Sequence, residues 1–231
     1  MKPAVLRDLP PLPASMRKLP VHRGYPVPWF VAWFDGVPDF RVVDEKRHAQ
    51  AVAGKRCLVC GGKIHGEFAF PIGPMCAVNR TSAEAPSHVD CAVFSAKACP
   101  FLSRPNMVRR MNDLPEGHVA PAGVMIERNP GVSLIWVTDT YRIFRHGDSG
   151  LFELGRPKRV LAFREGRPAT AAEVQESVAS GFLRLLEVAA KEDAVEELLA
   201  HLDRASVALR LDSGELRAAC AAQAGMSGAV A

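Results

Sequence analysis

The chain has no long apolar run and none of the short motifs that identify common enzyme classes. No stretch of the 231 residues stays apolar over the ~20 residues that a membrane-spanning helix needs. At the start of the chain, charge and Pro3 interrupt residues 1–8 before the apolar run of a secretion signal develops. A glycine-rich phosphate loop and a G-x-S-x-G nucleophile motif are also absent. We therefore expect a cytoplasmic protein that contacts no membrane.

Aromatic residues are scarce, at 7% of the sequence. The three tryptophans, Trp29, Trp33 and Trp136, each lie among apolar neighbours in a stretch that we predict to be a strand. Such rings belong to a hydrophobic core more often than to a stacking platform for nucleic-acid bases. With 48% apolar residues the chain can bury a sizeable core, and its length allows one domain or two small ones.

Charge is unevenly distributed, although the formal net charge is only +4. Residues 1–118 contain 16 Lys and Arg against 10 Asp and Glu, whereas residues 119–231 contain 13 against 15. A cationic half is typical of a protein that contacts nucleic acid, but an ordinary solvated surface can show the same imbalance.

Five of the six cysteines lie between Cys57 and Cys99, which makes this stretch the most informative part of the sequence. Cys57 and Cys60 form a C-x-x-C pair, and His88 and Cys91 form an H-x-x-C pair. Two such pairs supply the four ligands of a tetrahedral zinc site. Because four protein ligands leave no open position for water, we predict one structural zinc ion. Cysteines grouped in this way fit a reducing compartment better than a disulfide scaffold.

Three more residues near these pairs are candidate ligands, namely Cys76, Cys99 and His65. Along a helix, Cys99 would lie about 12 Å from Cys91, which is too far for both to bind one ion. Buried cysteines also pack as small apolar side chains, and a histidine beside a glycine is often exposed in a turn. We favour core packing for the two cysteines and an exposed turn for His65.

The residues around the two pairs predict a local fold. The glycines that follow Cys60 allow a tight knuckle whose backbone amides point at the thiolates. Ser87 and Asp90 form a capping-box variant that starts a helix carrying the second ligand pair. Between knuckle and helix we expect two short strands, 66–70 and 75–79. This order of knuckle, hairpin and helix resembles treble-clef zinc fingers.

The resemblance implies a zinc site and leaves several activities open, because treble clefs serve as nucleic-acid binders, nuclease cores and protein-interaction modules. A nuclease of the His-Asn-His type would hold a second metal near His65 and Asn79. It would also need a catalytic histidine beside the scissile phosphate, whereas His88 is already assigned to zinc. The segments 75–80 and 86–92 also look like those of a group of uncharacterised bacterial and phage proteins, a similarity that implies no function.

The rest of the chain predicts an α+β fold, in which the treble-clef-like zinc module is followed by an antiparallel β-meander and C-terminal helices. The expected parts are a proline-rich arm (1–28), a hairpin plus the zinc-binding module (29–118), the meander (119–167), C-terminal helices (168–213) and a flexible tail (214–231). Turn residues separate the meander strands, which we expect at 124–127, 132–138, 141–145, 151–154 and 159–163.

Several helices have clear start and stop signals. Asp44 caps a helix over 45–53, and a turn of helix is expected over 106–112. A capping box at Thr170 opens the first C-terminal helix, and Ser180-Gly181 predicts a break before the second. Apolar residues in the second helix form a seam that we expect to pack on the meander, with a weak dimer through this helix as the alternative to a monomer.

We therefore favour a zinc-binding, non-enzymatic nucleic-acid-binding or regulatory protein, with a protein-interaction adapter as the closest alternative. The partner would be DNA or RNA in the first case and another protein in the second. The expected phosphate contacts are Lys55, Arg56, Lys63, Arg80, Arg109 and Arg110.

Overall fold

A computed structural model describes residues 9–104, 107–108, 110, 112–115, 129, 131–146 and 149–228. Its helices are α1 (Glu45–Gly54), α2 (Pro74–Asn79), α3 (Val89–Ala98), α4 (Pro100–Ser103), α5 (Ala171–Lys191), α6 (Val195–Leu209) and α7 (Ser213–Gly228), with a 3-10 turn at Ala14–Met16. Its strands are β1 (Val21–His22), β2 (Tyr25–Pro26), β3 (Val31–Phe34), β4 (Val37–Val43), β5 (Phe68–Ile72), β6 (Thr81–Ser82), β7 (Ser133–Thr138), β8 (Tyr141–His146), β9 (Ser149–Leu154), β10 (Pro157–Arg164) and β11 (Arg167–Pro168).

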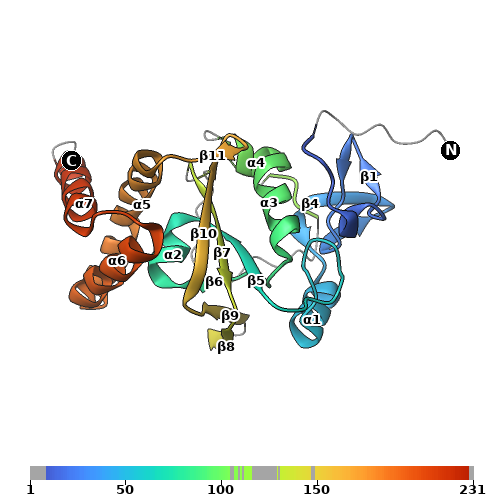
Figure 1. The fold of residues 1–231 in the computed structure, drawn as a ribbon, viewed down its shortest axis with the longest axis horizontal. Helices are drawn as coiled ribbons and strands as arrows, with labels where there is room; N and C mark the ends of the chain where they lie inside the picture. Colours follow the sequence, from blue (N-terminus) through green and yellow to red (C-terminus); the bar gives the residue numbers. More distant parts are fainter. Residues whose placement is uncertain are drawn as a thin grey trace.

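A four-stranded antiparallel sheet of order β11-β10-β7-β5 forms the centre of the molecule. Helix α3 covers one face of this sheet, while α2 and the C-terminal helices lie on the other (Figure 1). All side chains of β7 are buried, because Leu134 and Trp136 point to the helical core on one face and Ile135 and Val137 meet α3 on the other. Burial on both faces explains why this strand reads as a continuous apolar run.

The strands after residue 132 are antiparallel, as expected, but they do not follow one another across a single meander. β8 and β9 form a hairpin that leaves the central sheet and pairs with β6, and β10 then returns beside β7. The chain leaves the central sheet at Thr140 and returns to it at Gly155. These two residues lie so close that a Cβ on Gly155 would be 2.2 Å from the Thr140 carbonyl oxygen. The strand expected at 124–127 lies outside the described residues. Of the helical turn expected over 106–112, residues 107, 108, 110 and 112 are described, and none of them is helical.

The segment between knuckle and α3 is not the predicted hairpin. β5 pairs with β7 rather than with its sequence neighbour, and residues 74–79 form α2 instead of a strand. Pro74 occupies the first turn of α2, where its fixed φ favours a helix and its missing amide hydrogen costs nothing. The order resembles a treble clef only at the knuckle and at the helix that carries the second pair.

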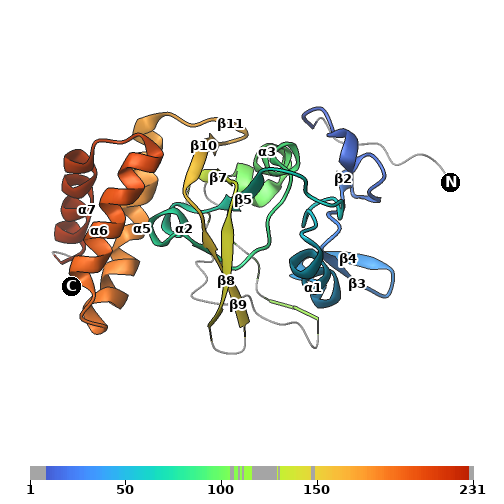
Figure 2. The same cartoon turned by 60° about the horizontal axis from the view of Figure 1, so that its bottom comes forward.

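The C-terminal helices form a layered bundle at one end of the molecule (Figure 2). α5 runs without a break through Ser180 and Gly181, contrary to the prediction, since a single glycine costs a long helix only about 1 kcal/mol. A Cβ on Gly181 would lie 3.0 Å from the Met75 side chain, so the glycine lets α2 pack closely. None of the helices in the described part of the chain combines the length and apolar character that crossing a membrane requires.

The apolar seam of α6 is buried as predicted, with Leu198, Leu202 and Ala205 at most 7% exposed. Its main contacts are α2, α5 and α7 rather than the strands. The flexible tail expected from residue 214 is instead helix α7 over most of its length, and its Leu216 and Cys220 side chains are buried against the bundle.

At the opposite end, the proline-rich segment packs on the body from Leu9 onward (Figure 1). Met16 and Val27 are each 1% exposed, and the short strands β1 and β2 pair with each other. The hairpin β3–β4 and helix α1 form as predicted, with Asp44 accepting a hydrogen bond from the Arg47 amide. We call residues 9–66 the N-terminal module.

Candidate metal centre

The four predicted ligands converge on one point between the N-terminal module and α3. The ligand atoms of Cys57, Cys60, His88 and Cys91 all lie within 4.8 Å of one another. Four donors that bind one ion tetrahedrally, each at ~2.0–2.3 Å from it, lie at similar distances from one another. The group can therefore hold a metal ion with little movement of its side chains.

The first pair is held by a knuckle closed by backbone hydrogen bonds. The Cys57 amide donates to the Gly62 carbonyl over 2.7 Å, and the Gly61 amide donates to the Cys57 carbonyl over 2.8 Å. Gly61 has a φ of +76°, and a Cβ there would lie 2.8 Å from the ring of Trp29. A glycine is therefore required for both the turn and the close approach of the indole.

The second pair lies at the start of α3, but the cap differs from the prediction. His88 occupies the N-cap and makes no capping hydrogen bond with its side chain. Ser87 is buried and pairs through its backbone with Ala69 of β5. Cys91 thus sits in the first turn of α3, where the positive end of the helix dipole favours a thiolate.

Backbone amides and a carbonyl orient the donors around this centre. The amides of Cys60 and His88 lie 3.5 and 3.3 Å from the Cys57 sulfur, to which they donate. The His88 Nε2 lies 3.1 Å from the Lys63 carbonyl oxygen, and its Nδ1 lies 3.3 Å from the Cys60 sulfur. If Nε2 carries the proton and donates it to Lys63, Nδ1 is free to bind a metal, which is the usual arrangement of metal-bound histidine.

Ser15 adds a contact to this centre that the sequence did not indicate. Its Oγ lies 3.2 Å from the Cys91 sulfur, so the hydroxyl can donate to a thiolate there. Because 76 positions separate the two residues, no local pattern reveals the contact. It ties the proline-rich segment directly to the metal centre.

The three thiols affect one another's ionisation. Hydrogen bonds from the Cys57 and Cys91 thiols lower the pKa of Cys60. The contact with Cys60 raises the pKa of Cys57, and the contacts with Cys57 and Cys60 raise the pKa of Cys91. The three sulfurs therefore do not ionise independently of one another. A divalent ion would allow all three sulfurs to ionise, so the donor set fits such an ion.

The additional candidate ligands do not join this cluster. The metal-binding group among the described residues contains neither Cys76, Cys99 nor His65. Burial raises the pKa of both cysteines, as expected for thiols that pack as apolar side chains. His65 is exposed just after the knuckle, in agreement with the prediction.

Of the six cations predicted to contact nucleic acid, three lie beside the metal centre. Lys55, Arg56 and Lys63 are exposed beside the knuckle, where Arg56 and Lys63 form a β-bridge. Arg80 instead donates from Nε to the Leu154 carbonyl over 3.1 Å. Arg110 forms an ion pair of 2.5 Å with Asp113, and Arg109 lies outside the described residues.

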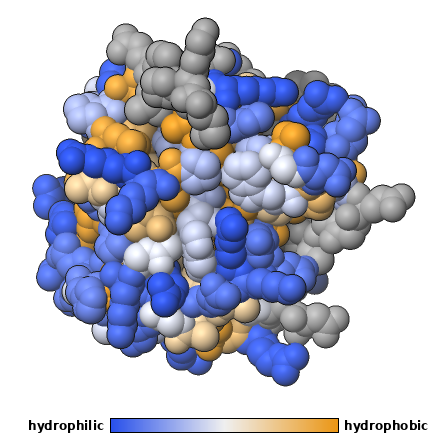
Figure 3. Space-filling model, turned by 90° about the vertical axis from the view of Figure 1, so that its right-hand side faces the viewer, coloured by the Kyte–Doolittle hydropathy of each residue, from blue (hydrophilic) through white to orange (hydrophobic). Residues whose placement is uncertain are grey.

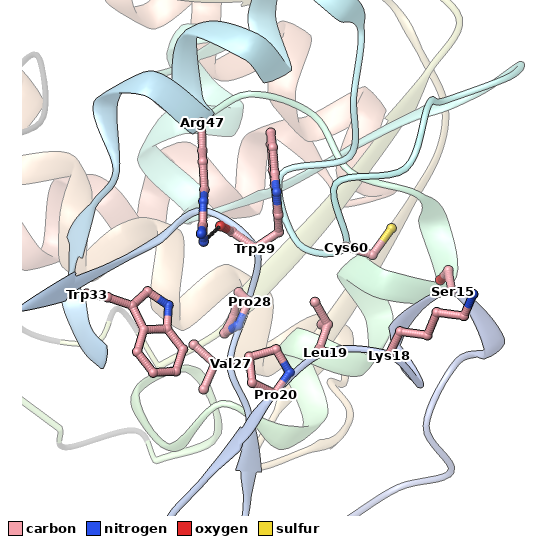
Figure 4. A pocket seen from close by; sticks show the side chains of 10 residues that line it. All are labelled: Ser15, Lys18, Leu19, Pro20, Val27, Pro28, Trp29, Trp33, Arg47 and Cys60. Atoms are coloured by element: carbon pink, nitrogen blue, oxygen red, sulfur yellow. Dashed lines mark hydrogen bonds between the residues drawn. The ribbon is translucent and has the colours of Figure 1, made fainter. Parts of the chain in front are cut away.

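A pocket of about 360 Å³ opens beside the metal centre (Figure 4). Its lining combines two tryptophans, two cations and apolar residues of the proline-rich segment, namely Ser15, Lys18, Leu19, Pro20, Val27, Pro28, Trp29, Trp33, Arg47 and Cys60. The expectation that all three tryptophans lie in the core holds for Trp136, which is 1% exposed, but is wrong for Trp33, which is 39% exposed. Trp33 lies in a two-stranded hairpin, which buries less surface than a central strand.

Comparison of the chain with protein-family models, with curated proteins and with solved structures gives no match, so neither of the two resemblances drawn from the sequence finds support there. The chemistry of the Cys3His group and of the surface around it is what points to a function.

Proposed function

We propose that this chain is a zinc-stabilised, non-enzymatic protein that binds nucleic acid through its N-terminal module. The observation that carries the proposal is the set of cations beside the metal centre. Lys55, Arg56 and Lys63 are exposed and form no ion pair within the described parts of the chain. Cations without carboxylate partners are available to phosphate groups.

Among the described Lys and Arg outside residues 9–66, eight of sixteen form ion pairs, whereas Lys55, Arg56 and Lys63 form none with described residues. The central strands and C-terminal helices carry the pairs Arg142–Glu153, Lys158–Glu67, Arg159–Glu67, Arg164–Glu176, Arg167–Glu173, Arg184–Glu187 and Arg217–Asp203. In contrast, residues 9–66 contain nine Lys and Arg against four Asp and Glu. The positive potential is therefore concentrated around the metal centre.

Zinc is the ion that best suits three cysteine sulfurs and one imidazole. When bound, it supplies a closed tetrahedral crosslink between the knuckle and α3, with the Ser15 contact extending the crosslink to the proline-rich segment. All four ligands come from the protein, so the ion has a structural role. Because His88 is one of these ligands, it cannot serve as the catalytic histidine that a nuclease of the His-Asn-His type requires.

An adapter that binds a protein is the second candidate, and the β3–β4 hairpin favours it. Trp33, Val37 and Phe40 on this hairpin are between 39% and 52% exposed. In the space-filling view of this end of the molecule, pale residues occupy much of the middle of the face, and orange ones are scattered among blue hydrophilic residues (Figure 3). Exposed apolar groups with a polar rim are typical of protein interfaces.

Salt dependence of nucleic-acid binding tests the proposal and separates the two candidates. We expect labelled DNA and RNA, single- and double-stranded, to bind the zinc-loaded protein at low salt and to dissociate steeply between roughly 50 and 200 mM salt. Replacing Lys55 and Lys63 by Glu should reduce the slope of log affinity against log salt by ~0.7–0.9 for each phosphate that the variant no longer binds.

Arg184→Glu provides the matched control, because this exposed cation is paired with Glu187 on α5 at the other end of the molecule. It should leave affinity and slope unchanged. Absence of binding at low salt would overturn the proposal and favour the adapter. Magnesium-dependent cleavage of the probe would instead indicate a nuclease.

A further inference from the structure

The pocket beside the knuckle has two aromatic walls. Trp29 is fixed in place, since its amide donates to the Val59 carbonyl over 2.7 Å and its ring packs against Gly61. Trp33 projects from β3 on the other side of the pocket (Figure 4) and is 39% exposed. Val27 and Pro28 also line the pocket and add apolar surface to it.

The charged groups around these walls are cationic. Lys18 and Arg47 line the pocket, and no carboxylate of the described residues lines it. Arg47 Nη1 donates to the Trp29 carbonyl over 2.6 Å and its Nε lies 3.5 Å from Asp44, so this guanidinium is held in position. Lys18 is exposed and forms no ion pair among the described residues.

A further cation connects the pocket to the knuckle. Arg56 Nη1 donates to the Gly61 carbonyl over 3.1 Å, and Gly61 is the residue against which the Trp29 ring packs. Lys18 and Arg47 thus line an aromatic and apolar pocket, and Arg56 adds a third cation at the knuckle residue that packs against Trp29. Its volume of about 360 Å³ falls within the roughly 300–1,000 Å³ range of small-ligand pockets.

We propose that this pocket receives an unpaired nucleobase of a single-stranded nucleic acid, which stacks on Trp33 while the flanking phosphates contact Lys18 and Arg56. The proposal rests on the nucleic-acid-binding function inferred above and names its substrate as single-stranded. An aromatic ring can stack on any base, and cations beside it follow the strand, which is how sequence-tolerant single-strand binders work. A proline-rich peptide would also suit the tryptophans, but it would leave the surrounding cations without a role.

Fluorescence anisotropy with labelled oligonucleotides of about 12 nucleotides tests this inference. We expect the zinc-loaded protein to bind oligothymidylate or oligouridylate more tightly than a duplex of the same length. Trp33→Ala should weaken single-strand binding roughly 5- to 150-fold, the range found when a stacking residue is removed. Because this variant removes no charge, the salt slope should stay the same, whereas Lys18→Ala should lower it by ~0.7.

Ile143→Ala is the control, since this β8 side chain is 45% exposed and lies outside the pocket. It should bind as the wild type does. Trp33→Phe keeps a stacking ring and should retain most of the affinity, which guards against a loss caused by misfolding of Trp33→Ala.

Each remaining outcome overturns the inference in a distinguishable way. If the wild type binds oligonucleotides but Trp33→Ala binds them equally well, the pocket is not the site while the proposed function stands. Equal affinity for duplex and single strand would likewise show that the pocket does not receive an unpaired base, while the proposed function stands. If the wild type binds no oligonucleotide at low salt, both proposals fail, and saturable binding of a proline-rich peptide would then assign the pocket to a protein partner.

Discussion

Gly61 shows how much of the metal centre depends on single residues. It combines a left-handed backbone with a contact to Trp29 that leaves no room for a side chain. Gly36, in the β3–β4 turn, has nearly the same φ, +77° against +76°, but nothing lies within 4 Å of an added Cβ. Substituting each glycine in turn therefore distinguishes the free-energy cost of a left-handed backbone from the cost of the steric overlap with Trp29.

We predict that Gly36→Ala lowers the free energy of unfolding by about 1 kcal/mol, because only the left-handed conformation is strained. Gly61→Ala should cost an additional ~1–3 kcal/mol, since its methyl group overlaps the indole of Trp29. Urea unfolding of both variants in the presence of zinc measures the difference. Equal losses would show that Trp29 is not packed against the knuckle.

At this scale, the sequence correctly predicts that the four proposed ligands come together, because each pair lies within four consecutive residues. The hydroxyl of Ser15 and the exposure of Trp33 could not be predicted, since both depend on how distant segments pack. The same holds for the contact of Arg80, whose guanidinium donates to the Leu154 carbonyl, 74 positions away in the sequence.

Among the elements, those with strong local signals were predicted and those set by tertiary pairing were not. Asp44 and Thr170 cap α1 and α5 at the expected positions, and the Asp35-Gly36 turn joins β3 to β4. The order of strands in the central sheet was wrong, because turn residues show where strands end but not which strands become neighbours. α7 was also missed, since its alanine-rich sequence gains its order from packing on α5 and α6.

The docking of α7 supplies a pH-dependent prediction. The Asp203 carboxylate of α6 accepts hydrogen bonds from Arg217 and Ser213 of α7, and these bonds lower its pKa from 3.8 to about 2. A carboxylate whose pKa is lower in the folded state stabilises the fold above its unfolded pKa and loses this effect as pH falls. The contribution is therefore complete above about pH 4 and disappears toward about pH 2.

We expect Asp203→Asn to be less stable than the wild type above about pH 4, and the difference to vanish near pH 2. Asp193→Asn makes the same chemical change between α5 and α6, at a residue without an ion pair among the described residues, and serves as the control for the substitution itself. Urea unfolding followed by circular dichroism at stepped pH gives both curves. A pH-independent gap for Asp203→Asn would mean that ionisation of Asp203 does not stabilise the fold.

For the molecule as a whole, the proposed metal centre lies where three segments of the chain meet. It connects the proline-rich segment, the knuckle and α3, and α3 also covers one face of the central sheet. Loss of the ion should therefore disturb more than the N-terminal module. Structural zinc contributes on the order of 10 kcal/mol to small modules, more than any single surface contact.

We predict one zinc ion per chain by elemental analysis of protein prepared without chelator. Cys60→Ser and Cys91→Ser should lose it and unfold the N-terminal half, because an incomplete ligand set cannot close the centre. Cys220→Ala, in the C-terminal bundle, should keep the ion. A stoichiometry near zero in the wild type would refute the zinc site, and a value near two would restore Cys76, Cys99 and His65 as ligands.

The position of α3 between the metal centre and the sheet also concerns the order in which the chain is made. Ser15 and all four proposed ligands precede β7, the strand that joins β5 to β10. During synthesis a metal ion can therefore be captured before the central sheet has all its strands. We expect α3 to be folded in the metal-bound segment before the later strands leave the ribosome, so that these strands pack against it as they are made.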